Sequence, residues 1–188
     1  MISEQRENEL ASMMQWAICA GDDYYFEMAQ DQFDKSMKGH EGEGFYHAYV
    51  RQRKVGFESF KNEIAEQMAA IDDAEELHSL LVDYNYDDGA WAIEQVLMHP
   101  HCDIATARMV YWLMEPSYYY EEFGGLEQTP EDSVNRTDAE LLAKIEEKAG
   151  AGLFQSGLQV AEDEDFAPKR DDTPPYHQIP TVLWKPAS

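Results

Sequence analysis

The chain is short of basic residues. Its 188 residues include 14 Lys and Arg but 38 Asp and Glu, which gives a formal net charge of -24 at pH 7. A negative field of this size repels the phosphates of nucleic acids and anionic membrane surfaces, so we expect the protein to bind neither. The same field accelerates encounter with a basic protein partner. Charge of one sign also keeps a protein soluble without any partner, and composition alone leaves both readings open.

Cysteine is also scarce, and long apolar runs are missing. Cys19 and Cys102 lie far apart and lack the paired spacing of a zinc site, and two cysteines do not make a disulfide framework. We expect two buried thiols in a reducing compartment. No stretch approaches the roughly 20 apolar residues of a membrane span. The first residues carry acids rather than the basic segment of a signal peptide, so the sequence predicts a cytoplasmic protein.

The sequence also lacks the alternation of apolar and polar residues that is typical of β-strands. Nevertheless 44% of the residues are apolar or aromatic, which excludes a disordered acidic chain. We expect an all-α fold, a multi-helix bundle of about seven or eight helices in a single domain over residues 1–188. Its parts are N-terminal helices over 1–72, a helical core over 73–150, and an irregular, docked tail over 151–188 with a short extended piece near 182–184.

Apolar residues recur at three- and four-residue steps, the spacing of amphipathic helices, in several stretches. The first stripe starts at Leu10, and its helix stops near Gly21. The longest helix, over 45–71, contains Gly56, which can bend it. The run over 104–114 is apolar nearly all the way round, which is typical of a central helix. Further helices are predicted over 22–39, 72–85, 89–99 and 137–150.

Polar residues mark several of the expected helix starts. Asp73 with Glu76 has the spacing of a capping box, and so has Thr137 with Glu140. Asp103 precedes the predicted central helix and is a suitable N-cap, because its carboxylate can accept hydrogen bonds from the first free amides. The sequence therefore predicts side-chain caps at three helices.

The stretch from Asp83 to Ala107, DYNYDDGAWAIEQVLMHPHCDIATA, concentrates side chains of the kind that bind metals. A metal site needs ligands that converge, whereas the His and Cys residues here lie on one bent connection. Carboxylates such as those of Asp87 and Asp88 stabilise a helix N-terminus by about 0.3–1 kcal/mol each. We therefore predict no metal and no cofactor. The motif residues given a structural role are Tyr84, Asn85, Asp87, Asp88, Gly89, His99, Pro100, Cys102 and Asp103.

Signatures of catalysis are missing as well. The chain has no G-x-S-x-G elbow, no phosphate-binding G-x-x-x-x-G-K-[ST] loop, and no cysteine beside a clear base. With 38 carboxylates, pairs of acids arise by chance, so no single pair points to acid–base chemistry. We predict no catalytic residues, and an acid–base enzyme stays an alternative.

Two segments of the same stretch carry a family resemblance. YNYDDG followed by HPHCDIATARMVYWL resembles the bacterial domain of unknown function 4274, whose pattern is close to Y-N-W-D-D-G, then H-P-x-C-D-x-G-T-A and an aromatic-apolar helix. The chain departs from the pattern at Tyr86, where the family favours Trp, and at Ala105, where it favours Gly. The resemblance covers residues 73–150 and leaves 1–72 uncovered. It implies a helical domain without an established activity, found near secreted toxin genes in the manner of immunity proteins.

The leading functional hypothesis is a cytoplasmic immunity protein that neutralises a basic secreted toxin, namely a nuclease effector. A nuclease is cationic because it grips phosphates, and an acidic inhibitor meets it faster. An adaptor or chaperone that escorts an effector would use the same surface. Aromatic residues beside acids are typical of interface hot spots. Core packing is the alternative for such tyrosines; it stays open for those at 118–120 and is preferred for Tyr25. The candidate partner-binding residues are Asp22, Asp23, Tyr24, Tyr118, Tyr119, Tyr120, Glu121, Glu122, Glu162, Asp163, Glu164 and Asp165.

Overall fold

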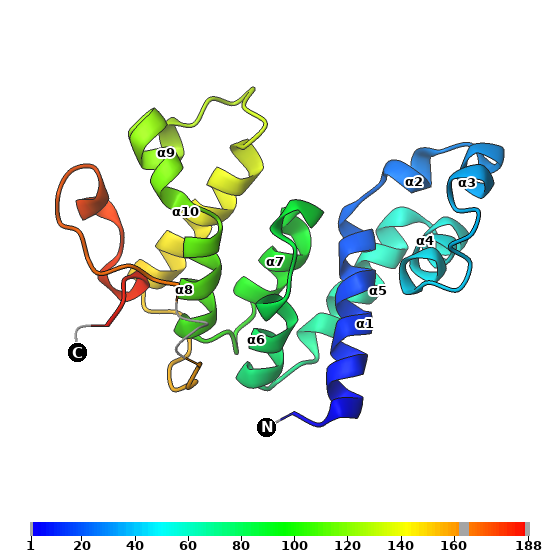
Figure 1. The fold of residues 1–188 in the computed structure, drawn as a ribbon, viewed down its shortest axis with the longest axis horizontal. Coiled ribbons are helices and arrows are strands. Elements are labelled where there is room, and N and C mark those ends of the chain that lie inside the picture. The colour runs from blue at the N-terminus through cyan, green and yellow to red at the C-terminus, as the bar shows by residue number, and fades with distance from the viewer. Residues whose placement is uncertain (1, 162–165, 187–188) are drawn as a thin grey trace. The chain divides into compact units, whose positions relative to one another are not determined.

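Helices account for the regular structure of this chain (Figure 1). The computed structural model describes residues 2–161 and 166–186, and within them it contains ten α-helices and no strand. The all-α prediction is therefore confirmed, with more helices than the seven or eight expected. None of the described helices is long and apolar enough to cross a membrane. The helices are α1 Glu4–Gly21, α2 Tyr24–Glu27, α3 Gln30–Ser36, α4 Gly44–Val55, α5 Phe57–Ala69, α6 Ala74–Val82, α7 Ala90–Leu97, α8 Ile104–Leu113, α9 Pro116–Phe123 and α10 Arg136–Gly150.

The chain divides into two compact units. Unit 1 comprises Met1–Leu80 and Asp87–Val96, and unit 2 comprises Leu81–Tyr86 and Leu97–Ser188. These boundaries fall inside the segment predicted as a helical core, because the chain leaves unit 1 near the end of α6 and returns to it for most of α7. Each unit has its own buried side chains and is described separately.

Unit 1 is built around α1, which lies against α4 and α5 (Figure 1). Leu10, Phe60 and Ile64 are fully or almost fully buried there. The end of α1 is held by a side chain: Gln52 on α4 donates through Nε2 to the carbonyl of Cys19 at 2.7 Å and to that of Asp22, the residue after the helix, at 3.0 Å. Helix C-termini leave carbonyls without partners, so this amide fixes α4 on α1.

The helix predicted over 22–39 is wrong in one respect, because the structure divides it into α2 and α3. Met28 has extended backbone angles (φ -69°, ψ 140°) and interrupts the helix. The guanidinium of Arg53 on α4 donates to the carbonyls of Tyr25, Phe26 and Met28, the last at 2.8 Å. It also lies 4.7 Å from the centre of the Phe33 ring. One half-buried cation thus replaces the backbone hydrogen bonds that a continuous helix would have made.

The long helix predicted over 45–71 is likewise two helices. Gly56 has φ +95°, a conformation open to glycine but costly for other residues, and it separates α4 from α5. Gly56 therefore ends one helix and begins the next instead of bending a single one. An ion pair of 3.0 Å between Arg51 and Glu63 links the two helices.

The predicted cap of α6 is half right. Asp73 accepts through Oδ1 from the amides of Glu75 at 2.7 Å and Glu76 at 3.3 Å, as an N-cap should. Glu76 binds Arg6 on α1 by two parallel hydrogen bonds of 2.8 and 2.6 Å. That pairing ties α6 to α1 within unit 1.

Unit 2 is organised by α8, of whose ten residues six are buried and none is exposed, as predicted for a central helix. The tail lies on this helix: Trp112 donates through its indole Nε1 to the carbonyl of Leu183 at 2.5 Å, and its ring lies 4.8 Å from that of Trp184. Leu183 and Trp184 are buried. The extended piece predicted near 182–184 is wrong, since Thr181–Leu183 forms a 3-10 turn.

Two further helix boundaries in unit 2 differ from the prediction. The run after Glu115, for which the sequence predicted no helix, is the helix α9, with Pro116 in its first turn and Gly124 (φ +84°) ending it. The helix α10 begins at Arg136, so Thr137 lies inside it and the predicted capping box is wrong. Glu140 instead pairs with Arg136 at 2.7 Å, one helical turn away.

Candidate functional site

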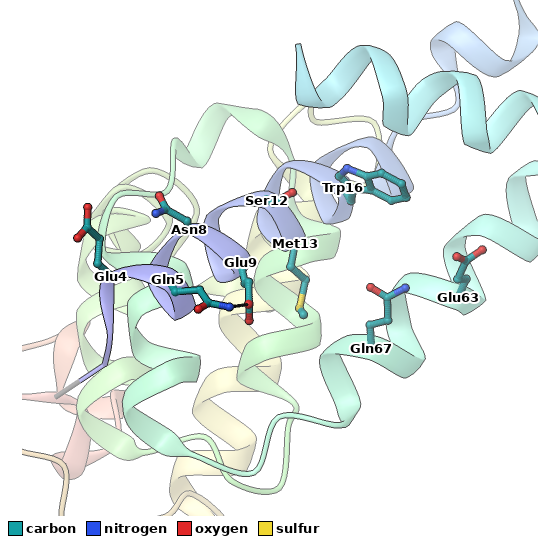
Figure 2. Close-up of a pocket in the computed structure, with 9 residues that line it drawn as sticks. All are labelled: Glu4, Gln5, Asn8, Glu9, Ser12, Met13, Trp16, Glu63 and Gln67. Atoms are coloured by element: carbon teal, nitrogen blue, oxygen red, sulfur yellow. Dashed lines mark hydrogen bonds between the residues drawn. The ribbon is translucent and has the colours of Figure 1, made fainter. Parts of the chain in front are cut away.

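A groove of about 920 Å³ lies between α1 and α5 in unit 1 (Figure 2). We call it the α1–α5 groove. Helix α1 presents side chains at positions 4, 5, 8, 9, 12, 13 and 16, the three- and four-residue spacing of one helical face. Helix α5 supplies the other wall. The lining residues are Glu4, Gln5, Asn8, Glu9, Ser12, Met13, Trp16, Glu63 and Gln67.

The groove combines negative charge with an aromatic surface. None of its described lining residues is Lys or Arg, and three are glutamates. Trp16 is half-buried, with its ring 5.8 Å from that of the buried Phe60. Figure 2 shows Trp16 at one end of the groove and Glu4 at the other. A tryptophan face beside carboxylates favours a cation, because the ring quadrupole and the negative charges attract it together.

The carboxylates of the groove are oriented by neighbours. Glu9 accepts from Gln5 at 3.0 Å and from Arg6 at 3.2 Å (Figure 2 shows the first bond), and these bonds hold the pKa of Glu9 below its ordinary value. Arg51 engages one oxygen of Glu63 at 3.0 Å. A carboxylate offers about four acceptor positions, so Glu9 and Glu63 each keep acceptor positions for a ligand.

The predicted partner residues at the end of α1 have mixed placements. Asp22 is half-buried; it accepts from the amide of Tyr24 at 2.9 Å and from the hydroxyl of Tyr49 at 3.0 Å. Its carboxylate therefore holds α4 and α2 in unit 1. Asp23 is exposed, and Tyr24 is 63% exposed with its ring 5.1 Å from that of Tyr25. Only Asp23 and Tyr24 present open surface.

The predicted tyrosine cluster on α9 is wrong in part. Tyr118 is 44% exposed, but Tyr119 and Tyr120 are each 4% exposed. Consecutive helical residues point about 100° apart, so three tyrosines in a row cannot share one face. Glu121 and Glu122 are exposed, and Glu121 accepts a hydrogen bond from Tyr176 of the tail. The remaining candidates, Glu162, Asp163, Glu164 and Asp165, lie outside the described residues.

Asp103 of the motif is buried and stabilises the fold through its carboxylate. It is 2% exposed. One carboxylate oxygen accepts from the amide of Ala105 at 2.8 Å and caps α8, as predicted. The other oxygen accepts from the amide of Leu158 at 3.1 Å. Backbone hydrogen bonds of 2.9 Å join Gln155 to Cys102 and Ile104 on either side. The carboxylate therefore ties the start of the tail to the start of the central helix.

The histidine–cysteine part of the motif is likewise a folded connection. Lys148 on α10 donates to the carbonyls of Leu97 at 2.7 Å and His99 at 2.9 Å. Cys102 is a buried free thiol whose pKa burial raises to about 12, so it is not a nucleophile at neutral pH. Pro100 accepts through its carbonyl from Gln155 at 3.2 Å. Among the residues that the structure describes, no group of three or more His, Cys, Asp or Glu could hold a metal ion.

The first half of the motif surrounds a short turn. Tyr84 is buried, with its ring 5.6 Å from that of Tyr86. Asp87 and Asp88 are exposed and belong to a 3-10 turn over Tyr86–Asp88, two residues before α7 begins. Asn85 and Gly89 are also exposed, and Gly89 has φ +96°.

Sequence reasoning missed a half-buried carboxyl group in unit 2. Glu146 on α10 accepts from the hydroxyls of Tyr111 and Tyr120, the second at 2.8 Å. Burial raises the pKa of Glu146 above its ordinary value and also raises those of both tyrosines. Glu146, Tyr120 and Glu127 line a smaller pocket of about 400 Å³. The sequence does carry one signal for this group. Glu146 is a polar residue on the otherwise apolar face of the predicted helix, three residues before Ala149.

Comparisons with known proteins bear on the central part of the chain. A family model described as Domain of unknown function (DUF4274) matches residues 72–149. No curated protein and no solved structure matches the chain. The match confirms over residues 72–149 the resemblance to the DUF4274 family that the YNYDDG and HPHCDIATA segments predicted.

Proposed function

We propose that this protein is a cytoplasmic immunity protein that binds and neutralises a basic secreted toxin, namely a nuclease effector. The observation that carries the proposal is the α1–α5 groove, an acidic hollow with a tryptophan wall on a chain of net charge -24. Nucleases need cationic surfaces to hold phosphates. An acidic inhibitor is attracted to such a surface at long range and covers it at short range.

The internal roles of the motif residues also favour binding over catalysis. Asp103 is used to cap α8 and hold the tail, and the Cys102 thiol is protonated at neutral pH because burial raises its pKa. Exposed acids such as Glu121 and Glu122 add to a field that steers a basic protein from a distance. The interaction that we propose therefore depends on surface charge and on the groove.

The test is capture of partners from the native host with the tagged full-length protein at low and high salt. A basic effector that is retained at low salt and released at high salt, and whose toxicity in cells is suppressed by this protein, is the expected result. An effector that binds without loss of toxicity would instead indicate an escort protein. Absence of any basic partner would contradict the proposal.

Glu146 supports a second candidate function, acid–base catalysis. A carboxyl group with a raised pKa that lines a pocket with Glu127 and Tyr120 is the arrangement that such an enzyme requires. Glu146→Gln distinguishes the two candidates, because neutralisation of a toxin by binding should survive this substitution and catalysis at Glu146 should not. Loss of neutralisation by a folded Glu146→Gln protein would favour the enzyme.

A further inference from the structure

The α1–α5 groove has features that select its occupant. It is long enough to be lined by more than three turns of α1, from Glu4 to Trp16, with Glu63 and Gln67 opposite. Its acids have no cation among the described lining residues, and Trp16 and Met13 supply the apolar contact. Phosphate-bearing ligands are repelled by this lining, and an apolar helix would bury the remaining acceptor positions of the glutamates without hydrogen-bond donors.

A second copy of the chain does not suit the groove either. Each copy carries a net charge of -24, so two copies repel each other at long range. The only complementary macromolecule is one whose contacting segment is positively charged.

We propose that the α1–α5 groove binds an arginine-bearing segment of the basic partner. One guanidinium stacks on the ring of Trp16 while donating to Glu63, and a second donates to Glu9. Arginine suits these positions better than lysine because its planar guanidinium stacks on aromatic rings and binds carboxylates through two parallel hydrogen bonds. This inference rests on the proposed function and adds the surface and the chemistry by which the partner is recognised.

The protein itself already contains this type of pairing. Arg6 binds Glu76 through two parallel hydrogen bonds and also reaches Glu9 at 3.2 Å. Arg51 reaches Glu63 at 3.0 Å. Glu9 and Glu63 are therefore held by guanidinium groups on one side, which orients them before a ligand arrives and reduces the entropy lost on binding.

The test uses an acetylated tetra-arginine amide as the probe and the four tryptophan indole N–H signals of the full-length protein in a ¹H–¹⁵N NMR spectrum. Trp16→Phe assigns the signal of Trp16. We expect saturable displacement of that signal at low salt. Glu9→Gln with Glu63→Gln should weaken binding about three- to tenfold, the range for two partly exposed charge pairs.

A matched control removes the same charge elsewhere. Glu131→Gln with Asp132→Asn takes two exposed carboxylates from the loop before α10 in unit 2, and it should leave the affinity for tetra-arginine within about twofold because only the long-range field changes. Equal weakening by the two double variants, or displacement of all four indole signals alike, would overturn the groove as a specific site. Displacement of the Trp16 signal by raising the protein concentration without peptide would assign the groove to a second copy and overturn the inference.

The two proposals fail in different ways. If a basic effector is captured from the host and its affinity is unchanged by Glu9→Gln with Glu63→Gln, the groove inference is wrong and the proposed function stands. If tetra-arginine binds the groove but no basic effector is captured, the groove stands as a site for arginine segments and the proposed function is wrong.

Discussion

Replacing Asp103 with Ala tests the structural role of the motif most directly. The substitution removes two acceptors at once, the cap of α8 through Ala105 and the link to Leu158 in the tail. Losing an N-cap costs about 1 kcal/mol, and leaving the half-buried Leu158 amide without a partner costs about 1–3 kcal/mol. We therefore expect Asp103→Ala to lower the free energy of unfolding by about 2–4 kcal/mol.

Two further variants separate these contributions. Asp73→Ala removes only a cap at an exposed residue, so it should cost about 0.5–2 kcal/mol. Asp103→Asn keeps one oxygen for the Ala105 amide but turns an NH₂ group towards the Leu158 amide, so it should fall between Asp103→Ala and the wild type.

The assay is urea-induced unfolding combined with native-state hydrogen exchange. Asp103→Ala should accelerate exchange at the amides of both Ala105 and Leu158, whereas Asp103→Asn should accelerate it mainly at Leu158. If Asp103→Ala costs no more than Asp73→Ala and the Leu158 amide exchanges at the wild-type rate, the carboxylate does not hold the tail. The structural account of the motif would then be refuted.

Three other substitutions test side-chain contacts within the two units. Arg53→Met should lower the free energy of unfolding by about 2–4 kcal/mol, since three carbonyls lose a charged donor; a change below about 0.5 kcal/mol in a urea titration would contradict this. Trp112→Phe should cost about 1–2 kcal/mol and make the tail sensitive to protease, because the bond to the Leu183 carbonyl is lost; an unchanged cleavage rate would contradict it. The raised pKa of Glu146 means that the folded protein binds this proton more tightly than the unfolded chain, so stability falls as pH rises from the ordinary glutamate range through the raised value. Glu146→Gln should therefore gain stability relative to the wild type as pH rises across that window. Glu147→Gln is the control for removing a carboxylate from α10. If the free energy of unfolding of the wild type and of Glu146→Gln depended equally on pH, the burial of a charged group would be contradicted.

Features that depend on near neighbours in sequence were predictable. The apolar stripe of α1, the Asp103 cap and the end of α10 at Gly150 all follow from periodicity or from a single residue's backbone chemistry. The missed helix α9 was also locally encoded. Pro116 lies in the first turn of α9, where its fixed φ and missing amide cost nothing.

Features that depend on distant residues were not predictable from the sequence. The interruption at Met28 is stabilised by Arg53, 25 residues away, which satisfies carbonyls that no local pattern leaves free. The acidic groove requires α1 and α5 to lie side by side, and nothing in the apolar spacing of either helix sets that pairing. For the same reason the sequence left open whether Tyr119 and Tyr120 lie in the core or on a binding surface, since the helix that contacts Tyr120 begins 16 residues later at Arg136.

The family segment and the groove belong to different stretches of sequence, yet unit 1 joins them. The groove is lined by residues of 4–67, outside the matched residues 72–149. Glu76 of the matched segment holds α1 through Arg6 at 2.6 Å, and Trp91 of the same segment lies 5.4 Å from the Lys61 ammonium on α5. Both walls of the groove are thus held by the matched segment. That segment positions α1 and α5 but does not line the groove itself. If the groove recognises the partner, recognition can change through residues of α1 and α5 while the matched segment keeps its structure, because the anchoring residues are not themselves groove-lining.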